Sequence, residues 1–314
     1  TKYGLNMRYF FPEMNYLKGG SEHFYTIYGS NTVFNSFRVI ERDKVSSVIP
    51  TSDVKKEFLN RFISKPNSTL GLNFETPLIM GILNVTPDSF YDGEESFSEN
   101  QFVEKGLELL ETGCCILDVG GESTRPGAKE VLSRIEIERV VGVIKKIKKT
   151  APSAIISVDT RKAIVAEKAL QAGASIVNDI SAGSFDKKMF SVVAKYKAGM
   201  CLMHSQGLPE NMQDKPNYDN VLLDIYDSLE EKITKAESKG ISREKIVIDP
   251  GIGFGKNFKH NMEIIKKAGL FLGLGCPLMI GLSRKSFIGE IISERLPSAR
   301  LAGSIAAMLK TISN

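Results

Sequence analysis

MGILNVTPDSF at residues 80–90 is the stretch that decides the fold, because a short apolar strand runs directly into a polar loop. The apolar run ends abruptly at Asn84, and Thr86, Asp88 and Ser89 follow with oxygens that can bind a metal and hydroxyls that can donate to an anion. In a chain of alternating strands and helices, such a junction lies at the carboxyl end of a strand, where (β/α)8 barrels carry their active-site loops. The stretch therefore predicts a barrel strand that leads into a functional site.

The sequence around this stretch alternates between short apolar strands and amphipathic helices, which is typical of a parallel sheet built from β-α units. The alternation begins at about Pro77 and shows helical periodicity between the strands, as at residues 101–112, 134–149 and 223–239. Helices are predicted to end at Gly113, Gly173 and Gly240. The seven predicted strands cover residues 78–84, 115–119, 155–158, 175–178, 200–203, 246–248 and 277–281.

Seven such units predict an α/β fold of the (β/α)8 TIM-barrel type whose last strand is missing from this chain. Only residues 312–314 follow the predicted helix 299–311, whereas closure of a barrel requires another strand. An open, doubly wound sheet is the structural alternative. We expect a C-terminally incomplete barrel domain over residues 74–314.

The first 73 residues have a different character. Aromatic residues crowd segments 9–11 and 24–28, and an alternating stretch follows at 33–40. Turn residues and a short predicted helix at 53–62 then lead toward the barrel. We therefore expect a small β-rich N-terminal extension over residues 1–73.

Composition restricts the classes of partner. The chain has 314 residues, of which 42% are hydrophobic and 25% charged, so it is long enough to bury a sizeable core. The net charge of +4 is small and the charges are interspersed, which argues against nucleic-acid binding and against a membrane anchor. No apolar run approaches the roughly 20 residues of a membrane span, and the N-terminus lacks the layout of a signal peptide. These features predict a cytoplasmic protein.

Cysteines and histidines show no metal-binding pattern. Cys114, Cys115, Cys201 and Cys276 lack any CxxC spacing, so buried free thiols are predicted rather than disulfides or metal ligands. The three histidines are scattered and share no ligand spacing, which argues against a zinc site.

Polar residues stand at the ends of the first six predicted strands, and one more lies just beyond the seventh. Carboxylates and amides gathered at one mouth are costly to bury unless N–H groups or a cation lie among them. Any one of these residues could serve as a helix cap, but the whole set together indicates a binding site. Its members are Asn84, Asp118, Asp159, Asn178, His204, Asp249 and Lys285.

Three loops carry further signals. GGESTRPG at 120–127 combines flexible backbone, hydroxyls and a guanidinium, which suits an anion, although an ordinary surface turn is the alternative. DPGIGFGK at 249–256 contains GxGxG, but without the spacing of a dinucleotide fingerprint or a Walker loop. GLSRKSF at 281–287 follows a strand and opens a helix, so the backbone near Ser286 could face an anion while Lys285 donates to a carbonyl or ring nitrogen.

Taken in order, these motifs resemble the dihydropteroate synthase family of folate biosynthesis over residues 78–310. The resemblance is carried by MGILNVTPDSF at 80–90, DVGGESTRPGA at 118–128, SVDT at 157–160, NDI at 178–180, CLMH at 201–204, DPGIGFGK at 249–256 and SRKSFIG at 283–289.

The resemblance implies a pterin-binding TIM barrel that joins 6-hydroxymethyl-7,8-dihydropterin pyrophosphate to 4-aminobenzoate. The products would be 7,8-dihydropteroate and pyrophosphate, with Mg²⁺ as cofactor, sulfonamides as competitors and a homodimer as the assembly. Pyrophosphate would leave first, giving a pterin carbocation that the arylamine attacks. The implied catalytic residues are Arg125, Asp159, Asp249 and Lys285. The implied substrate-binding residues are Asn84, which would also meet Mg²⁺, and Asp118, Thr124, Pro126, Asn178, Met203, Gly253, Phe254 and Ser286.

Two departures from the family pattern are visible. Glu94 stands where the family usually has the second glycine of an Asp-Gly-Gly run, and the final strand with its Arg-x-His motif is missing. The second departure suggests an incomplete copy of a longer protein. One rival is a pterin-binding barrel of the methyltransferase type, which the loops at 124–126 and 283–286 disfavour. The other is a non-catalytic pterin-binding regulatory protein, which would bind pterin without aminobenzoate-dependent chemistry.

Overall fold

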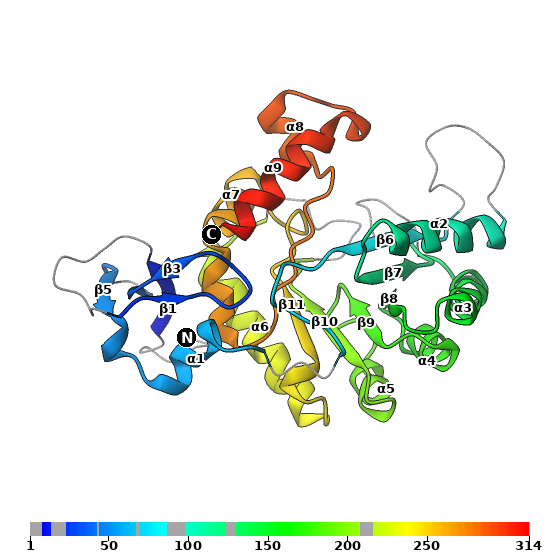
Figure 1. Ribbon diagram of the computed structural model, residues 1–314, viewed down its shortest axis with the longest axis horizontal. Coiled ribbons are helices and arrows are strands. Elements are labelled where there is room, and N and C mark those ends of the chain that lie inside the picture. Colours follow the sequence, from blue (N-terminus) through cyan, green and yellow to red (C-terminus); the bar gives the residue numbers. More distant parts are fainter. Residues whose placement is uncertain are drawn as a thin grey trace.

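The computed structural model describes residues 8–13, 23–42, 44–66, 70–86, 98–123, 130–207 and 216–313. Its centre is a parallel sheet of six strands in the order β11-β10-β9-β8-β7-β6, with helices along its outer side (Figure 1). The strands are β6 (Met80–Asn84), β7 (Ile116–Gly120), β8 (Ile155–Asp159), β9 (Ile176–Asp179), β10 (Gly199–Met203) and β11 (Ile246–Asp249).

The helices that follow these strands are α2 (Glu99–Glu111), α3 (Ser133–Thr150), α4 (Ala163–Ala172), α5 (Met189–Lys195), α6 (Val221–Ser238) and α7 (Phe258–Lys266). The 3-10 helix η2 (Arg243–Lys245) precedes β11, and the 3-10 helix η3 (Ala268–Leu274) follows α7. The chain then continues into α8 (Ser286–Ile292), η4 (Pro297–Arg300) and α9 (Leu301–Ile312). Neighbouring helices along the row from α2 to α5 pack side by side (Figure 1).

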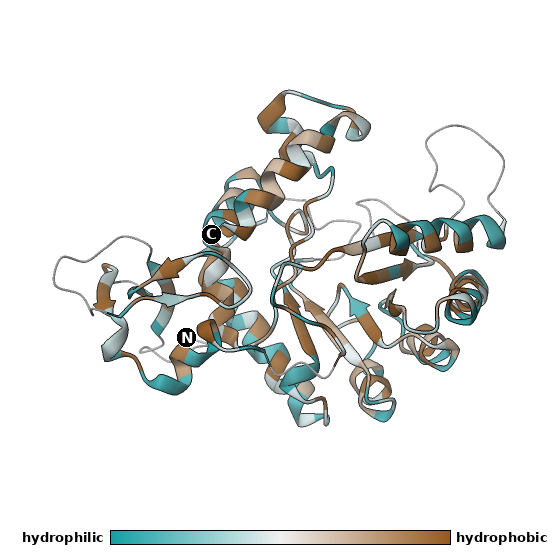
Figure 2. Cartoon of the chain, in the orientation of Figure 1, coloured by the Kyte–Doolittle hydropathy of each residue, from teal (hydrophilic) through white to brown (hydrophobic). Residues whose placement is uncertain are grey.

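Sequence order and spatial order coincide in this sheet, as expected for successive β-α units. One side of each strand faces the helices: Leu83, Val119, Val158 and Val177 are all at most 3% exposed and belong to one core with residues of α3 and α4. Figure 2 shows the strands as largely hydrophobic and the helices as mixed, which is the pattern of a sheet covered by amphipathic helices. The α/β, TIM-barrel-type prediction is thus confirmed.

Local signals explain where the helices begin and end. Ser98 caps α2 through a capping box with Gln101, and Asn220 caps α6. The three glycines predicted to end helices all adopt positive φ, with values of 107° at Gly113, 116° at Gly173 and 90° at Gly240. Each of the first six predicted strands is found within two residues of its predicted bounds.

The predicted seventh strand at 277–281 is wrong as a strand. The segment forms one isolated parallel bridge between Ile248 and Leu278, with hydrogen bonds from Ile248 N to Pro277 O and from Met279 N to Ile248 O. Among the described residues no closed barrel forms, and β6 is an edge strand. Ile79 and Ile82, next to and within this edge strand, are therefore 62% and 60% exposed.

The N-terminal part is β-rich, as predicted. An antiparallel sheet has the order β1-β4-β5, from β1 (Arg8–Glu13), β4 (Ser36–Glu41) and β5 (Ser47–Pro50). It is accompanied by a short ladder of β2 (Tyr25–Thr26) with β3 (Val33–Phe34), the 3-10 helix η1 (Thr51–Asp53) and α1 (Lys56–Ile63). An aromatic cluster that includes Phe34, Phe37 and Phe62 forms a second small core.

This N-terminal sheet lies against the parallel-sheet part beside α6 and η3 (Figure 1). Tyr9 of β1 is fully buried in the main core, and its hydroxyl donates to Asp227 of α6 at 2.8 Å. Arg42 Nη2 reaches the same carboxylate at 2.8 Å. The boundary between residues 73 and 74 stays a prediction, but the two parts share buried side chains.

Within the described part of the chain, no helix combines the length and the apolar character that crossing a membrane requires. The cytoplasmic location also stays a prediction.

Candidate active site

The register of the parallel sheet brings predicted site residues into one row. Asn84 is paired with Gly120, Gly120 with Asp159, and Asp159 with Asn178. Side chains of paired residues in neighbouring parallel strands point to the same face, and this face is opposite the helices. Three polar side chains that are widely separated in sequence thus meet at the carboxyl ends of β6, β8 and β9.

Asp118 lies one step deeper on the same face. Asn178 Nδ2 donates to Asp118 Oδ2 at 2.9 Å, and both residues are at most 8% exposed. The other carboxylate oxygen, Oδ1, is buried without a hydrogen-bond partner. Burial raises the pKa of Asp118, partly opposed by the neighbouring Ser157 and Asn178 side chains.

The ionised form of Asp159 is disfavoured more strongly than that of Asp118. Asp159 Oδ1 is also buried without a partner. Burial raises the pKa of Asp159 well above its ordinary value, and the negative charges of Asp118, Glu136 and Asp179 raise it further. A buried carboxylate with an unsatisfied oxygen is a costly arrangement in the free protein. It is the arrangement expected where a ligand supplies N–H donors.

Strand β10 lies between the strands that carry Asn178 and Asp249. The Cys201 thiol lies on β10, in register with Asn178, and this residue is 1% exposed. Burial raises its pKa far above the ordinary value, and the charges of Asp249, Asp118 and Asp159 add to the shift. The register also pairs Met203, at the end of β10, with Asp249 of β11, so this third carboxylate lies at the same end of the sheet.

The prediction of buried free thiols holds for Cys201 and Cys276, whereas Cys114 is partly exposed and Cys115 is exposed. No group of three or more histidine, cysteine or acidic residues that could hold a metal is found among the described ranges.

The glycines of the 249–256 loop are explained by close contact with the neighbouring backbone. A β-carbon on Gly251 would lie 1.9 Å from His204 O, and one on Gly255 would lie 2.5 Å from Gln206 O. Both glycines have positive φ, 71° and 63°. Glycine is thus required because the loop packs directly on the segment after β10. Within the loop, Asp249 Oδ1 accepts from Gly251 N at 2.7 Å.

Lys285 is the residue that precedes α8, and its side chain reaches this loop. Its ammonium donates to Ile252 O and lies 4.9 Å from the centroid of the Phe254 ring. Burial lowers the pKa of Lys285 to about 8, and the charge of Asp249 opposes this shift. A β-carbon on Gly253 would lie 3.3 Å from Lys285 Cδ. Loop and lysine therefore form one wall of the site.

The remaining predicted residues lie as follows. Met203 is 3% exposed at the end of β10, and Ser286 is exposed at the first position of α8. His204 is buried behind the 249–256 loop, where it contacts Lys256 instead of lining the mouth. Thr124, Arg125 and Pro126 lie outside the described residues, as does Asp88.

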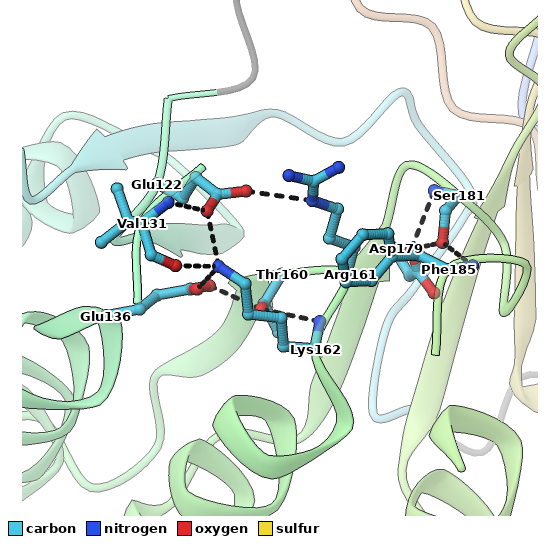
Figure 3. A network of polar contacts seen from close by, with 9 residues as sticks. All are labelled: Glu122, Val131, Glu136, Thr160, Arg161, Lys162, Asp179, Ser181 and Phe185. Atoms are coloured by element: carbon cyan, nitrogen blue, oxygen red, sulfur yellow. Dashed lines mark hydrogen bonds and ion pairs between the residues drawn. The ribbon is translucent and has the colours of Figure 1, made fainter. Parts of the chain in front are cut away.

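Sequence reasoning missed a buried charge network beside the site (Figure 3). Lys162 Nζ contacts Glu122 Oε2 at 2.5 Å, Glu136 Oε2 at 2.7 Å and Val131 O at 2.5 Å. Val131 N donates back to Glu122 Oε2 at 2.7 Å, so Glu122 and Val131, which flank residues 124–129, are tied together. Arg161 Nε donates to Glu122 Oε1 at 3.1 Å while its guanidinium lies 4.2 Å from the Phe185 ring centroid.

A signal for this network was present in the sequence. Glu136 shares the helix face of Val140, Val143 and Ile147, which are fully buried. A glutamate at a core-facing position of an amphipathic helix requires a buried cation as partner. The sequence does not identify which cation this is, and the structure shows that it is Lys162, the residue before α4.

The fold and the carboxylate-lined site can now be compared with known proteins. Residues 80–314 match the family described as pterin binding enzyme. Among curated proteins, dihydropteroate synthase of Escherichia coli K12 is 42% identical over 235 residues, which are 75% of this chain and 82% of that protein. Dihydropteroate synthase of Bacillus subtilis 168 is 42% identical over 234 residues, covering 74% of this chain and 79% of that protein.

Solved structures agree with this class. Xanthomonas albilineans dihydropteroate synthase with 4-aminobenzoic acid superposes with a TM-score of 0.72 at 40% identity, covering 77% of this chain and 85% of that one. The Yersinia pestis enzyme with a sulfonamide drug complex gives 0.73 at 38% identity, covering 76% and 86%. This chain belongs to the dihydropteroate synthase family.

Proposed function

We propose that this chain condenses 6-hydroxymethyl-7,8-dihydropterin pyrophosphate with 4-aminobenzoate to give 7,8-dihydropteroate and pyrophosphate. The observation that carries the proposal is the pair of buried, unpartnered oxygens on Asp118 and Asp159. The amino-pyrimidinone edge of a pterin offers several N–H donors, which would satisfy both oxygens. A relative from Xanthomonas albilineans in complex with 7,8-dihydropteroate supports the same chemistry.

The pterin would lie between the strand ends and the 249–256 loop. Asp118, Asp159 and Asp249 would accept from its N–H groups, and Asn178 would complete the edge with its amide. Lys285, whose ammonium contacts Ile252 O and lies 4.9 Å from the centroid of the Phe254 ring, would donate to an acceptor atom of the pterin ring. The hydrogen bond from Asn178 to Asp118 leaves the amide oxygen of Asn178 available as an acceptor.

Aminobenzoate would approach from the side of Phe254. The half-buried Phe254 ring offers an apolar face, and the exposed Ser286 hydroxyl could donate to the carboxylate. Arg125, Thr124 and Pro126 are assigned to pyrophosphate and aminobenzoate by resemblance alone. Sulfonamides resemble aminobenzoate and would compete with it, in line with the sulfonamide complex of the Yersinia pestis relative.

The residues present fit a Mg²⁺ ion that is held mainly by substrate. Asn84 Oδ1 and Asp159 Oδ2 lie 3.5 Å and 3.6 Å from the position of a β-carbon on Gly120, so two oxygens converge where pyrophosphate would lie. Mg²⁺ is typically held by one or two protein oxygens together with phosphates and waters. Asn84 would be the protein ligand, and the ion would offset charge on the departing pyrophosphate.

In the proposed reaction the C–O bond to pyrophosphate breaks first and the bonding electrons leave with the pyrophosphate. The positive charge that develops on the pterin methylene carbon would be stabilised by Asp159 and Asp249. The nitrogen lone pair of aminobenzoate then forms the new C–N bond, and the amine loses one proton. No side-chain nucleophile is required.

The test is pyrophosphate release from the dihydropterin pyrophosphate in the presence of Mg²⁺, with and without 4-aminobenzoate. We expect release that depends on aminobenzoate and yields dihydropteroate. Tight pterin binding without such release would instead indicate a non-catalytic pterin-binding protein, and loss of both would contradict the pocket assignment.

A homodimer is the proposed assembly. The apolar side chains Leu301, Ile305, Leu309 and Ile312 recur along one face of α9 and are between 44% and 63% exposed. Such a face is typical of an interaction surface. Sedimentation at several concentrations, compared with Ile305→Glu, would show whether this face holds two copies together.

A further inference from the structure

Lys256 is a buried lysine for which the proposed reaction has no use. It is the last residue of the 249–256 loop and is 3% exposed. Its Nζ contacts His204 Nδ1 at 3.1 Å, His204 O at 3.2 Å and Phe254 O at 2.9 Å. Among the ion pairs of the described residues, none involves Lys256. Its partners are thus two backbone carbonyls and one imidazole.

The hydrogen bonds of this lysine balance without a counter-ion. Burial lowers the pKa of Lys256 well below its ordinary value, and burial likewise lowers the pKa of His204. Burial favours the uncharged form of both groups, and in that form the amine can donate two N–H groups to the two carbonyls and accept from an Nδ1–H of His204. Every polar atom of the contact is then satisfied, so Lys256 serves as a geometric brace rather than as a charge.

What Lys256 braces is the peptide of Phe254. The Phe254 N–H donates to Gly251 O at 3.1 Å, and Lys256 holds the Phe254 carbonyl, so both polar groups of this residue are anchored. The rest of the loop is held elsewhere: Asn261 Oδ1 accepts from Gly253 N at 2.9 Å, and the Tyr218 hydroxyl donates to Gly255 O at 2.8 Å. Among the described contacts, Lys256 alone links the Phe254 carbonyl to the segment after β10.

The orientation of Phe254 matters because its ring lies 4.9 Å from the Lys285 ammonium. A shift of the Phe254 backbone would move the ring relative to Lys285 and change the wall that the aryl substrate meets. Misplacement of a substrate-positioning group by about 1 Å can cost on the order of 100-fold in rate.

We propose that Lys256 is a positioning residue for the aminobenzoate half of the reaction, acting through the backbone and ring of Phe254 without touching substrate. This inference rests on the function proposed above and deepens it. It assigns to the final lysine of DPGIGFGK a structural task that its contacts with His204 and Phe254 define.

The first experiment replaces the amine with an apolar side chain of similar length, Lys256→Met. The kcat/KM for aminobenzoate should fall about tenfold, because the ring is no longer held in place. Pterin pyrophosphate affinity, measured by calorimetry, should stay within about twofold, because Asp118, Asp159 and Asn178 are untouched. Lys195→Met is the matched control, since the Lys195 side chain is 65% exposed and its contacts are with Glu167 and the Tyr196 ring, away from the 249–256 loop, and it should change neither quantity.

The second experiment is a double-mutant cycle with Phe254→Leu. If Lys256 acts through the ring, Lys256→Met should have almost no further effect on kcat/KM for aminobenzoate once the ring has been removed. An equal loss in both backgrounds would overturn the inference, and so would an equal loss of pterin affinity in the single variant. Lys256→Gln, which keeps two N–H donors, provides the same cycle should the methionine variant fail to fold, with a smaller loss expected.

Failure of this inference is distinguishable from failure of the proposed function. Aminobenzoate-dependent turnover by the unaltered chain together with an additive cycle would contradict only the role of Lys256. No such turnover by the unaltered chain would contradict the function itself.

Discussion

Asn84 and Asp159 converge across Gly120, although 75 residues separate them in the sequence. Asn84 Oδ1 and Asp159 Oδ2 lie 3.5 Å and 3.6 Å from the point that a β-carbon on Gly120 would occupy. The parallel register of β6, β7 and β8 produces this arrangement. The candidate metal ligand and the candidate charge-stabilising carboxylate therefore share one small space.

Asp159→Asn should lower kcat on the order of 100-fold while the protein stays folded, because the amide keeps the shape but removes the negative charge. Folding stability should be equal or higher, since the charges of Asp118, Glu136 and Asp179 all disfavour an ionised Asp159. Aminobenzoate-dependent pyrophosphate release measures the first effect, and thermal unfolding the second. Glu104→Gln on the exposed side of α2 is the control, and unchanged turnover in Asp159→Asn would exclude the assigned role.

Gly120→Ala tests the shared space directly. The added methyl would lie 3.5 Å from both Asn84 Oδ1 and Asp159 Cβ, which is ordinary contact, so the fold should tolerate it. The methyl would nevertheless occupy the gap where pyrophosphate is expected. The kcat/KM for the pterin substrate should therefore fall about tenfold or more, because even a small misplacement of the reacting groups lowers the rate. Steady-state kinetics and thermal unfolding together decide the matter, and loss of stability in step with activity would contradict it.

Pterin affinity should weaken as the pH rises through about 8. Burial lowers the pKa of Lys285 to about 8, so the ammonium that donates to the pterin is present below that pH and is lost above it. A bound acceptor favours the charged form, so binding is strongest below about pH 8. Calorimetric titration between pH 7 and 9.5 measures the change. Lys285→Arg stays charged over this range and should lack the inflection; an inflection of the same size in that variant would assign the effect to another group.

Lys162→Met should cost about 3–5 kcal/mol of folding stability near pH 8, because it leaves Glu122 and Glu136 buried without their shared cation. Lys162 lowers the pKa of Glu136, so its removal raises that pKa further. A carboxyl group whose pKa is raised by folding favours the folded state when protonated, and the loss should therefore be smaller at pH 5 than at pH 8.

Urea unfolding at the two pH values measures this difference, with the surface variant Lys195→Met as control, for which no measurable loss is expected at either pH. A loss independent of pH would mean that packing, not charge, sets the cost.

Tyr9→Phe should destabilise the protein by about 1–3 kcal/mol, because the buried Asp227 loses a donor at 2.8 Å. Since Tyr9 lies in the main core, the N-terminal sheet and the parallel sheet should unfold in one transition. Tyr28→Phe is a matched control, because the Tyr28 hydroxyl is buried without a partner and its removal should cost nothing. Two separate unfolding transitions, with only the first shifted by Tyr9→Phe, would contradict the shared core.

Much of the fold was predictable because its signals are local. Apolar runs marked six strands, and glycines such as Gly173 marked helix ends, since a left-handed residue is needed there. The strand predicted at 277–281 was wrong because an apolar run indicates only a tendency to form a strand. It does not show whether a neighbouring strand provides a continuous series of backbone hydrogen bonds. The one bridge of this segment to Ile248 depends on the position of β11.

The candidate site was predictable only in part. Asn84, Asp118, Asp159, Asn178 and Asp249 stand at strand ends, and a parallel register must bring such residues together. His204 shares that position in the sequence, yet it faces Lys256, because the 249–256 loop packs over it. Lys162 and Lys256 resemble ordinary surface lysines in the sequence, and their burial follows from contacts made by distant segments.

The sequence by itself determined the order of strands and helices, the residues at the strand ends and the family resemblance, because these depend on local pattern and on motif identity. Only the tertiary structure decided which oxygens lack partners, which lysines brace the loops and where the parallel sheet stays open among the described residues. Those properties depend on desolvation and on hydrogen-bond geometry between segments far apart in the chain. The local sequence does not determine which of these segments meet.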